Sequence, residues 1–209
     1  MTVPSIERYA EANIPTEYGT FRVVAFREVG SSTEHLAIVC GHVEGKSNVL
    51  ARAHSECLTG EVLHSLKCDC REQLDLAFRR IAAAGEGVVL YLRQEGRGIG
   101  LGNKLRAYAL QEQGLDTVDA NTRLGFEPDQ RRYHAAAEML HDLGITSIAL
   151  LTNNPAKVDA LRADGVVVAS RVDHEVLPNR ENRSYLQTKR DRMGHLLELG
   201  DPLPPYDAE

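Results

Sequence analysis

This 209-residue sequence lacks both a membrane-length apolar run and a surplus of basic residues. No stretch approaches the roughly 18 consecutive apolar residues that a transmembrane helix needs. The N-terminus also lacks the charged start, apolar run and cleavage site of a secretory signal. Lys and Arg number 24 against 30 Asp and Glu, a net charge of −6. We therefore expect a cytoplasmic protein that binds no membrane. We also expect no nucleic-acid partner, because contacts with nucleic-acid phosphates need a surplus of Lys and Arg.

Cysteine is scarce, which argues against a fold held by disulfides. There are four cysteines, and three of them fall within one short segment, a usage that fits a reducing compartment. The fourth, Cys40, follows an apolar run and is expected in the core. A chain of this length buries a core without covalent staples. We expect a single domain over residues 1–200 and a flexible tail over residues 198–209.

The three clustered cysteines, Cys57, Cys68 and Cys70, have the pattern of metal ligands. Residues two apart in an extended segment lie on the same side but about 6.7 Å from each other, so Cys68 and Cys70 converge on one ion only in a turn. Thiolates select Zn²⁺, and three protein ligands leave the fourth tetrahedral position to water or substrate. His54 or His64 as a fourth ligand would instead close the site and make the zinc structural. Three unrelated buried thiols are the simplest alternative.

The first part of the sequence is rich in β-forming residues. Residues 20–27, 34–43 and 48–54 predict strands separated by glycine-containing turns. The third strand would end just before Cys57. Residues 1–15 show no strong periodicity and are expected to form an N-terminal arm.

Helical and strand patterns alternate in the remainder of the sequence. Periodic apolar residues predict helices from 74 to a stop at 85, over 105–113, over 133–143 and over 157–163. Asn153-Asn154 caps the last of these helices, with Pro155 in its first turn. Apolar runs predict strands over 88–92, 147–151 and 166–169. Residues 117–128 are expected to be irregular. The run Lys189–Arg192 in the charged tail is expected on a solvated helix face, with proline-rich disorder after it.

These elements predict an α+β or α/β fold with a mixed sheet. A strand-rich part over residues 1–56 is followed by a zinc and helix segment over 57–114 and a β-α-β part over 115–197.

A second group of residues suits a polyphosphate. The glycine-rich loop 95–102 lies between an apolar strand and a helix, where backbone N–H groups meet anions. It matches neither the dinucleotide fingerprint nor the phosphate loop. Arg131 and Lys157 lie near the starts of two helices, whose N-termini also favour anions. Each cation alone would usually be a surface charge; together with the loop they indicate a triphosphate site.

Five further motifs stand beside the cysteine cluster. They are Glu95–Leu101, Asn103–Tyr108, Asp116–Asn121, Leu124–Phe126 and Leu151–Pro155. With these motifs and the cysteines, the chain resembles GTP cyclohydrolase II from about Pro15 to Leu197. The resemblance implies that the protein opens the imidazole ring of GTP and releases formate and pyrophosphate. The product would be 2,5-diamino-6-(5-phosphoribosylamino)pyrimidin-4(3H)-one, in the first step of riboflavin biosynthesis. The resemblance also implies one Zn²⁺ per chain, Mg²⁺ with the pyrophosphate, and a homodimer.

The resemblance assigns a role to each matching residue. Cys57, Cys68 and Cys70 match the zinc ligands, Asp129 the proton acceptor, Arg131 the nucleophile at the α-phosphorus and Tyr108 an active-site tyrosine. The positions that match GTP contacts are Arg52, Ala53, His54, Ser55, Glu56, Gln73, Glu95, Gly96, Arg97, Thr117, Thr152 and Lys157.

Two of these roles have alternatives or refinements. Arginine is almost always protonated, so Arg131 could instead stabilise the transferring phosphoryl charge while water attacks. Glu95 is the first candidate to accept hydrogen bonds from the guanine edge. Arg71 stands where the family usually has glycine, and Asp173-His174 where proline and an apolar residue are common.

Two other functions are compatible with the same residues. A variant of the family could stop at the formamidopyrimidine or serve a pathway other than riboflavin. A non-catalytic zinc module with an RNA-binding surface is the more remote alternative.

Overall fold

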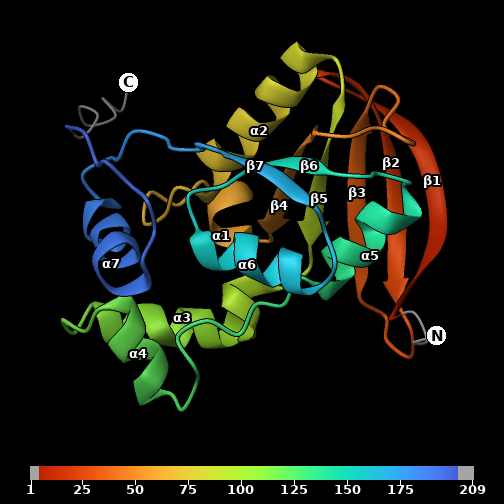
Figure 1. Ribbon diagram of the computed structural model, residues 1–209. Helices are drawn as coiled ribbons and strands as arrows, with labels where there is room; N and C mark the ends of the chain where they lie inside the picture. Colours follow the sequence, from red (N-terminus) through yellow and green to blue (C-terminus); the bar gives the residue numbers. More distant parts are fainter. Residues whose placement is uncertain (1–4, 202–209) are drawn as a thin grey trace.

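The computed structural model describes residues 5–201, in which seven strands form one mixed sheet (Figure 1). The strands are β1 (Ile6–Thr16), β2 (Gly19–Glu28), β3 (Glu34–Cys40), β4 (Val49–Ser55), β5 (Gly87–Leu92), β6 (Ile148–Leu151) and β7 (Val168–Val172). Their order in the sheet is β1-β2-β3-β5-β4-β6-β7. The pairs from β1 to β5 are antiparallel, whereas β4 is parallel to both β5 and β6, and β6 to β7. This confirms the predicted mixed α+β architecture.

Helices cover both faces of the sheet (Figure 1). They are α1 (Leu58–Glu61), α2 (Cys70–Ala84), the 3₁₀ turn η1 (Glu95–Gly98), α3 (Gly100–Gln111), α4 (Thr117–Arg123), α5 (His134–Asp142), α6 (Pro155–Ala163) and α7 (Arg183–Met193). Side chains alternate along β5, so Val88 and Leu90 pack with α5 and α6, while Val89 packs with α2. Among residues 5–201, no helix is long and apolar enough to cross a membrane.

The N-terminal arm predicted over residues 1–15 is wrong for residues 6–15, which belong to β1. This edge strand pairs with β2 along its length, but only Ile6 among its side chains is buried. Backbone hydrogen bonds therefore hold it without the apolar alternation by which a strand is seen in sequence. Residues 1–4 lie outside the described part of the chain.

Two helix predictions need correction. Residues 117–123 form α4 rather than an irregular segment, and Asp116 caps this helix by accepting a hydrogen bond from Asp119 N at 2.9 Å. Helix α3 begins at Gly100, earlier than predicted. The prediction missed this start because glycine has a low helix propensity. The cap of α6 is confirmed, since Asn154 Oδ1 accepts from Ala156 N at 3.1 Å.

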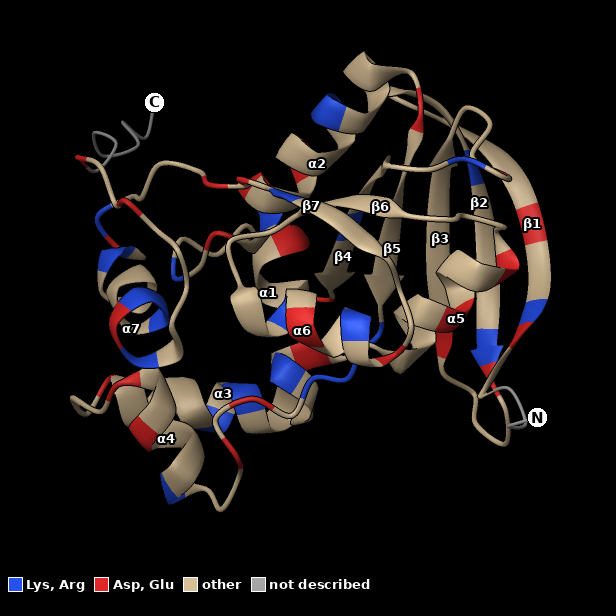
Figure 2. Cartoon of the chain, viewed as in Figure 1, with Lys and Arg blue, Asp and Glu red and all other residues tan. Residues whose placement is uncertain are grey.

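Helix α7 is polar, and ion pairs fix much of its position. The prediction of a solvated face is wrong for Lys189, whose Nζ lies 2.7 Å from Asp69 Oδ1, with the two side chains 12% and 3% exposed. Arg190 and Asp191 are exposed, as predicted. Arg192 pairs with Asp116 and with the nearby Asp119 of α4. Figure 2 shows residues of both signs on α7.

The start of the predicted tail is hydrogen-bonded to the rest of the chain. The backbone N–H groups of Glu198 and Leu199 donate to the Glu175 carboxylate. Residues 202–209, where proline-rich disorder is predicted, lie outside the described residues.

We expect Lys189→Met to lower the free energy of unfolding by about 3 kcal/mol, because it leaves the Asp69 carboxylate buried without a counter-charge. The control is Arg190→Met, whose side chain is exposed and pairs only with its neighbour Asp191. This control should leave the urea midpoint unchanged. Equal midpoints for wild type and Lys189→Met would contradict a stabilising role for the ion pair.

Candidate active site

A cavity opens beside the carboxyl ends of the parallel strands. Residues that follow β4, β5, β6 and β7 line it together with α3 and α7, which is where open α/β sheets usually bind ligands. Every residue with a predicted site role lines this cavity except Ala53 and Asp129. Both exceptions contact a lining residue: Ala53 O accepts from Lys157 Nζ at 2.6 Å, and Asp129 pairs with Arg131.

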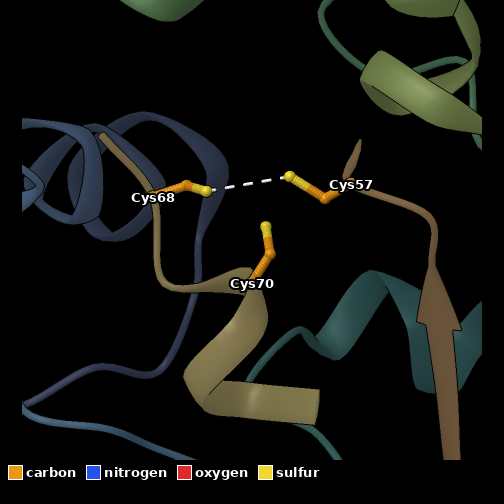
Figure 3. A group of neighbouring side chains, drawn as sticks. All are labelled: Cys57, Cys68 and Cys70. Carbon is orange, nitrogen blue, oxygen red and sulfur yellow. Dashed lines mark hydrogen bonds between the residues drawn. The ribbon is translucent and has the colours of Figure 1, made fainter. Parts of the chain in front are cut away.

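The sulfurs of Cys57, Cys68 and Cys70 point toward one another at one wall of the cavity (Figure 3). Cys57 follows β4, while Cys68 and Cys70 flank a bend that leads into α2, as the turn prediction requires. All three sulfurs lie within 4.8 Å of one another, with Cys57 and Cys68 at 3.7 Å. Tetrahedral zinc with Zn–S bonds of about 2.3 Å separates its sulfurs by about 3.8 Å, so the three residues fit this ion.

The surroundings of the sulfurs favour an open site. Within residues 5–201, this group of possible metal ligands contains the three cysteines alone. His54 Nε2 lies 2.8 Å from Glu61 Oε1, and His64 is exposed. Neither histidine therefore supplies the fourth ligand that a closed structural site would need.

Gly60 of α1 leaves room for the cysteine sulfurs. A Cβ at this position would lie 2.9 Å from Cys68 Sγ and 3.2 Å from Cys57 Sγ. We expect Gly60→Ala to weaken zinc binding about tenfold or more, because the methyl group pushes a ligand aside. The control is Gly102→Ala in α3, where nothing lies within 4 Å of the added carbon. Chelator competition measures both variants, and unchanged affinity in Gly60→Ala would contradict the crowding.

Arg52, Arg131 and Lys157 form a group of cations in the same cavity. Burial lowers the pKa of Arg52 to about 10. Burial, followed by the charges of Arg52 and Arg131, holds the pKa of Lys157 well below its ordinary value. Arg52 Nε and Tyr133 Oη are buried without a hydrogen-bond partner in the described chain. An anion bound here would relieve the repulsion between the cations and pair with these groups.

Asp129 holds Arg131 in place. The Arg131 Nε lies 2.8 Å from Asp129 Oδ1, and a second nitrogen of the same guanidinium pairs with Oδ2. Burial opposes the charge, but Tyr133 and the Asp129 carboxylate outweigh it and raise the pKa of Arg131 above its ordinary value. Arg131 is therefore protonated, a state suited to stabilising phosphoryl charge rather than to nucleophilic attack.

Glu95 already has several protein partners. One carboxylate oxygen accepts from Leu58 N at 2.6 Å, and the other accepts from Gly96 N at 2.6 Å and Lys104 Nζ at 2.8 Å. A guanine edge would have to share these oxygens. Tyr108 lies on the same side of the cavity as Lys104, 5.8 Å from ring centroid to Nζ, and burial raises the pKa of its hydroxyl.

Sequence reasoning missed several lining residues. Lys104 falls inside a motif that the resemblance used, but nothing in its spacing indicates a contact with a cysteine. Tyr185, Lys189 and His195 come from α7 and the turn after it, which carry no motif. Lys189 pairs with Asp69 in the metal segment. Burial raises the pKa of Asp69, but the charge and hydrogen bond of Lys189 outweigh burial and lower this pKa.

The two departures from the family pattern lie in different surroundings. Arg71 is directed toward Asp75 one helical turn on, at 3.9 Å, and is absent from the cavity lining. His174 lines the cavity, and its Nε2 lies 2.8 Å from Gln73 O. Burial lowers the pKa of His174 to about 2, so it is neutral and donates this bond. The first departure thus leaves the cavity unchanged, whereas the second supports Gln73.

Comparisons with known proteins point to one family. The family model described as GTP cyclohydrolase II matches residues 7–173. The chain is 54% identical to the GTP cyclohydrolase-2 of Hahella chejuensis, covering 92% of this chain and 93% of that protein. It is 52% identical to the GTP cyclohydrolase-2 of Actinobacillus succinogenes, covering 92% and 88%.

Longer relatives contain a similar region. The chain is 49% identical to the riboflavin biosynthesis protein RibBA of Endomicrobium trichonymphae. This match covers 92% of this chain but 48% of that protein. Among solved structures, RibBX from A. baumannii, a two domain 3,4-dihydroxy-2-butanone 4-phosphate synthase, matches with a TM-score of 0.47 at 24% identity. That match covers 81% of this chain and 41% of RibBX.

Proposed function

Because the chain belongs to the GTP cyclohydrolase II family, and so is a hydrolase of riboflavin biosynthesis, we propose that it opens the imidazole ring of GTP. Formate and pyrophosphate leave, and 2,5-diamino-6-(5-phosphoribosylamino)pyrimidin-4(3H)-one is the product. The observation that carries this proposal is one cavity lined by three convergent sulfurs and by a cluster of buried cations. The sulfurs suit hydrolysis of a base, and the cations suit its triphosphate.

Cys57, Cys68 and Cys70 would hold the zinc, which when bound supplies Lewis acidity for the hydrolysis. Tyr108 is close enough to this wall to move a proton or orient a water, and its raised pKa keeps the hydroxyl protonated as a donor. The charged state of Tyr108 therefore takes no part in the proposed chemistry.

The cations bind the phosphates. Arg131, held by Asp129, stabilises the charge that develops as the α-phosphorus reacts, and Arg52 and Lys157 neutralise the neighbouring oxygens. Mg²⁺, when bound with the triphosphate, would supply positive charge that stabilises the leaving pyrophosphate. The remaining GTP contacts are assigned to Ala53, His54, Ser55, Glu56, Gln73, Glu95, Gly96, Arg97, Thr117 and Thr152, nine of which line the cavity.

We assign residues 1–200 to one catalytic domain, which the single sheet formed between residues 6 and 172 supports. The homodimer, the cytoplasmic location and the absence of a nucleic-acid partner stay predictions.

The test is mass spectrometry of the products formed from GTP with Zn²⁺ and Mg²⁺ present, with formate and pyrophosphate measured separately. Equal amounts of formate, pyrophosphate and the diaminopyrimidine are expected. A formamidopyrimidine as the end product would identify a family variant that stops early. Zinc-loaded protein that leaves GTP intact would contradict the proposed activity.

A further inference from the structure

Lys104 connects the cysteine cluster to the glycine-rich turn. Its ammonium Nζ lies 3.1 Å from Cys57 Sγ and 2.8 Å from Glu95 Oε1. The Lys104 side chain is 12% exposed and that of Glu95 10%. Lys104 belongs to α3, whereas Cys57 follows β4, so the contact is made by the tertiary fold. No role is assigned to Lys104 by the site described so far.

The charges around Lys104 indicate what its ammonium does. Three thiolates and one divalent ion leave one net negative charge in a mostly buried place. The Glu95 carboxylate is already stabilised by the backbone N–H groups of Leu58 and Gly96. It therefore needs little further compensation, and Lys104 is the described cation that reaches a cysteine sulfur. A charged donor forms a short, strong hydrogen bond to such an acceptor.

We propose that Lys104 is a positioning residue of the metal centre, oriented by Glu95, whose ammonium donates a hydrogen bond to the Cys57 thiolate. This bond fixes the direction of the sulfur and draws electron density from it, so that the bound ion stays a strong Lewis acid. Partners of metal ligands tune a site in this way. The proposal rests on the zinc site of the proposed function, but its test is independent of turnover.

A purely structural role would make a different prediction. The Lys104 side chain also packs against the η1 turn, since a Cβ on Gly96 would lie 3.1 Å from Lys104 Cβ. If Lys104 only anchored this turn through Glu95, its removal would leave the electronic state of the sulfurs unchanged. A measurement on the metal–sulfur bond therefore separates the two roles.

Cobalt-substituted protein provides that measurement without GTP. A hydrogen bond lowers the energy of the sulfur electrons, so its loss moves the sulfur-to-cobalt charge-transfer band to longer wavelength. We expect this shift in Lys104→Met, with zinc affinity in chelator competition weakened about tenfold or more. Lys104→Arg, which keeps a charged donor, should restore both properties toward wild type.

The matched control is Lys67→Met. Lys67 precedes Cys68, pairs with Glu112 and lies 5.3 Å from the Tyr108 ring centroid, but its nitrogen contacts no sulfur of residues 5–201. The charge-transfer band and zinc affinity of Lys67→Met should match wild type.

A wild-type band in Lys104→Met would overturn the proposal, and so would an equal shift in Lys67→Met. If Lys104→Met does not fold, Lys104→Gln gives the same reading with a smaller shift. Absence of GTP turnover in wild type would contradict the proposed function and leave the cobalt result to decide this proposal.

Discussion

Arg131→Ala protein should release neither pyrophosphate nor formate from GTP, with turnover lowered by roughly 10³-fold or more, the range known for arginines that stabilise phosphoryl transfer. The side chain is held by the Asp129 carboxylate and lies with Arg52 in the cavity. Its removal takes away transition-state charge stabilisation and also loosens Asp129. Zinc content should stay at the wild-type value, because the cysteines are separate from this pair.

The neighbouring Arg132 is a matched control, since its side chain is exposed and absent from the cavity lining. Arg132→Ala should keep wild-type turnover. Formate without pyrophosphate from Arg131→Ala would show that the ring opens before the phosphate reacts. Wild-type turnover to both products would remove Arg131 from the mechanism. Thermal unfolding of both variants separates loss of catalysis from loss of fold.

Cys68→Ser should lose formate release by more than about 100-fold, because even changes to the partners of metal ligands cost 10–100-fold. Serine replaces a soft sulfur with an oxygen that binds zinc poorly in this geometry. The cations that face the phosphates are untouched. Folded, zinc-free Cys68→Ser protein should therefore still convert GTP slowly to GMP and pyrophosphate.

Cys40→Ser is the control for general effects of replacing a thiol, since Cys40 is partly buried against the core beside α2 and is absent from the cavity lining. It should keep its zinc and its formate release. Metal analysis, formate and pyrophosphate are measured on the same preparations. If folded Cys68→Ser releases no pyrophosphate, the two halves of the reaction are coupled rather than separable.

The sequence allowed the metal segment to be predicted because its signal is local. Cys68 and Cys70 are close in the chain, and two ligands of one ion at this spacing need a bend between them. The cap of α6 at Asn154 was likewise visible, since a cap depends on the next two or three residues. The short buried strands were visible as apolar runs.

The features that were missed depend on contacts between distant parts of the chain. Lys189 is 120 residues from Asp69, and a lysine in a charged run has the same local pattern whether it is solvated or paired. β1 is an edge strand with one buried side chain, so only its pairing with β2 defines it. Lys104 was visible as part of a motif, but its proximity to Cys57 follows from the packing of α3 beside the end of β4.

The placement of the three cysteines links metal binding to folding. Cys57 stands at one end of the excursion between β4 and α2, and Cys68 and Cys70 stand at the other, with α1 between them. An ion held by all three closes this segment into a loop, so ordering the loop and binding the metal become one equilibrium. Each tenfold rise in free zinc above the dissociation constant would then add about 1.4 kcal/mol to the stability of the folded segment. The zinc supply would thereby set how much of the protein has an ordered segment between β4 and α2.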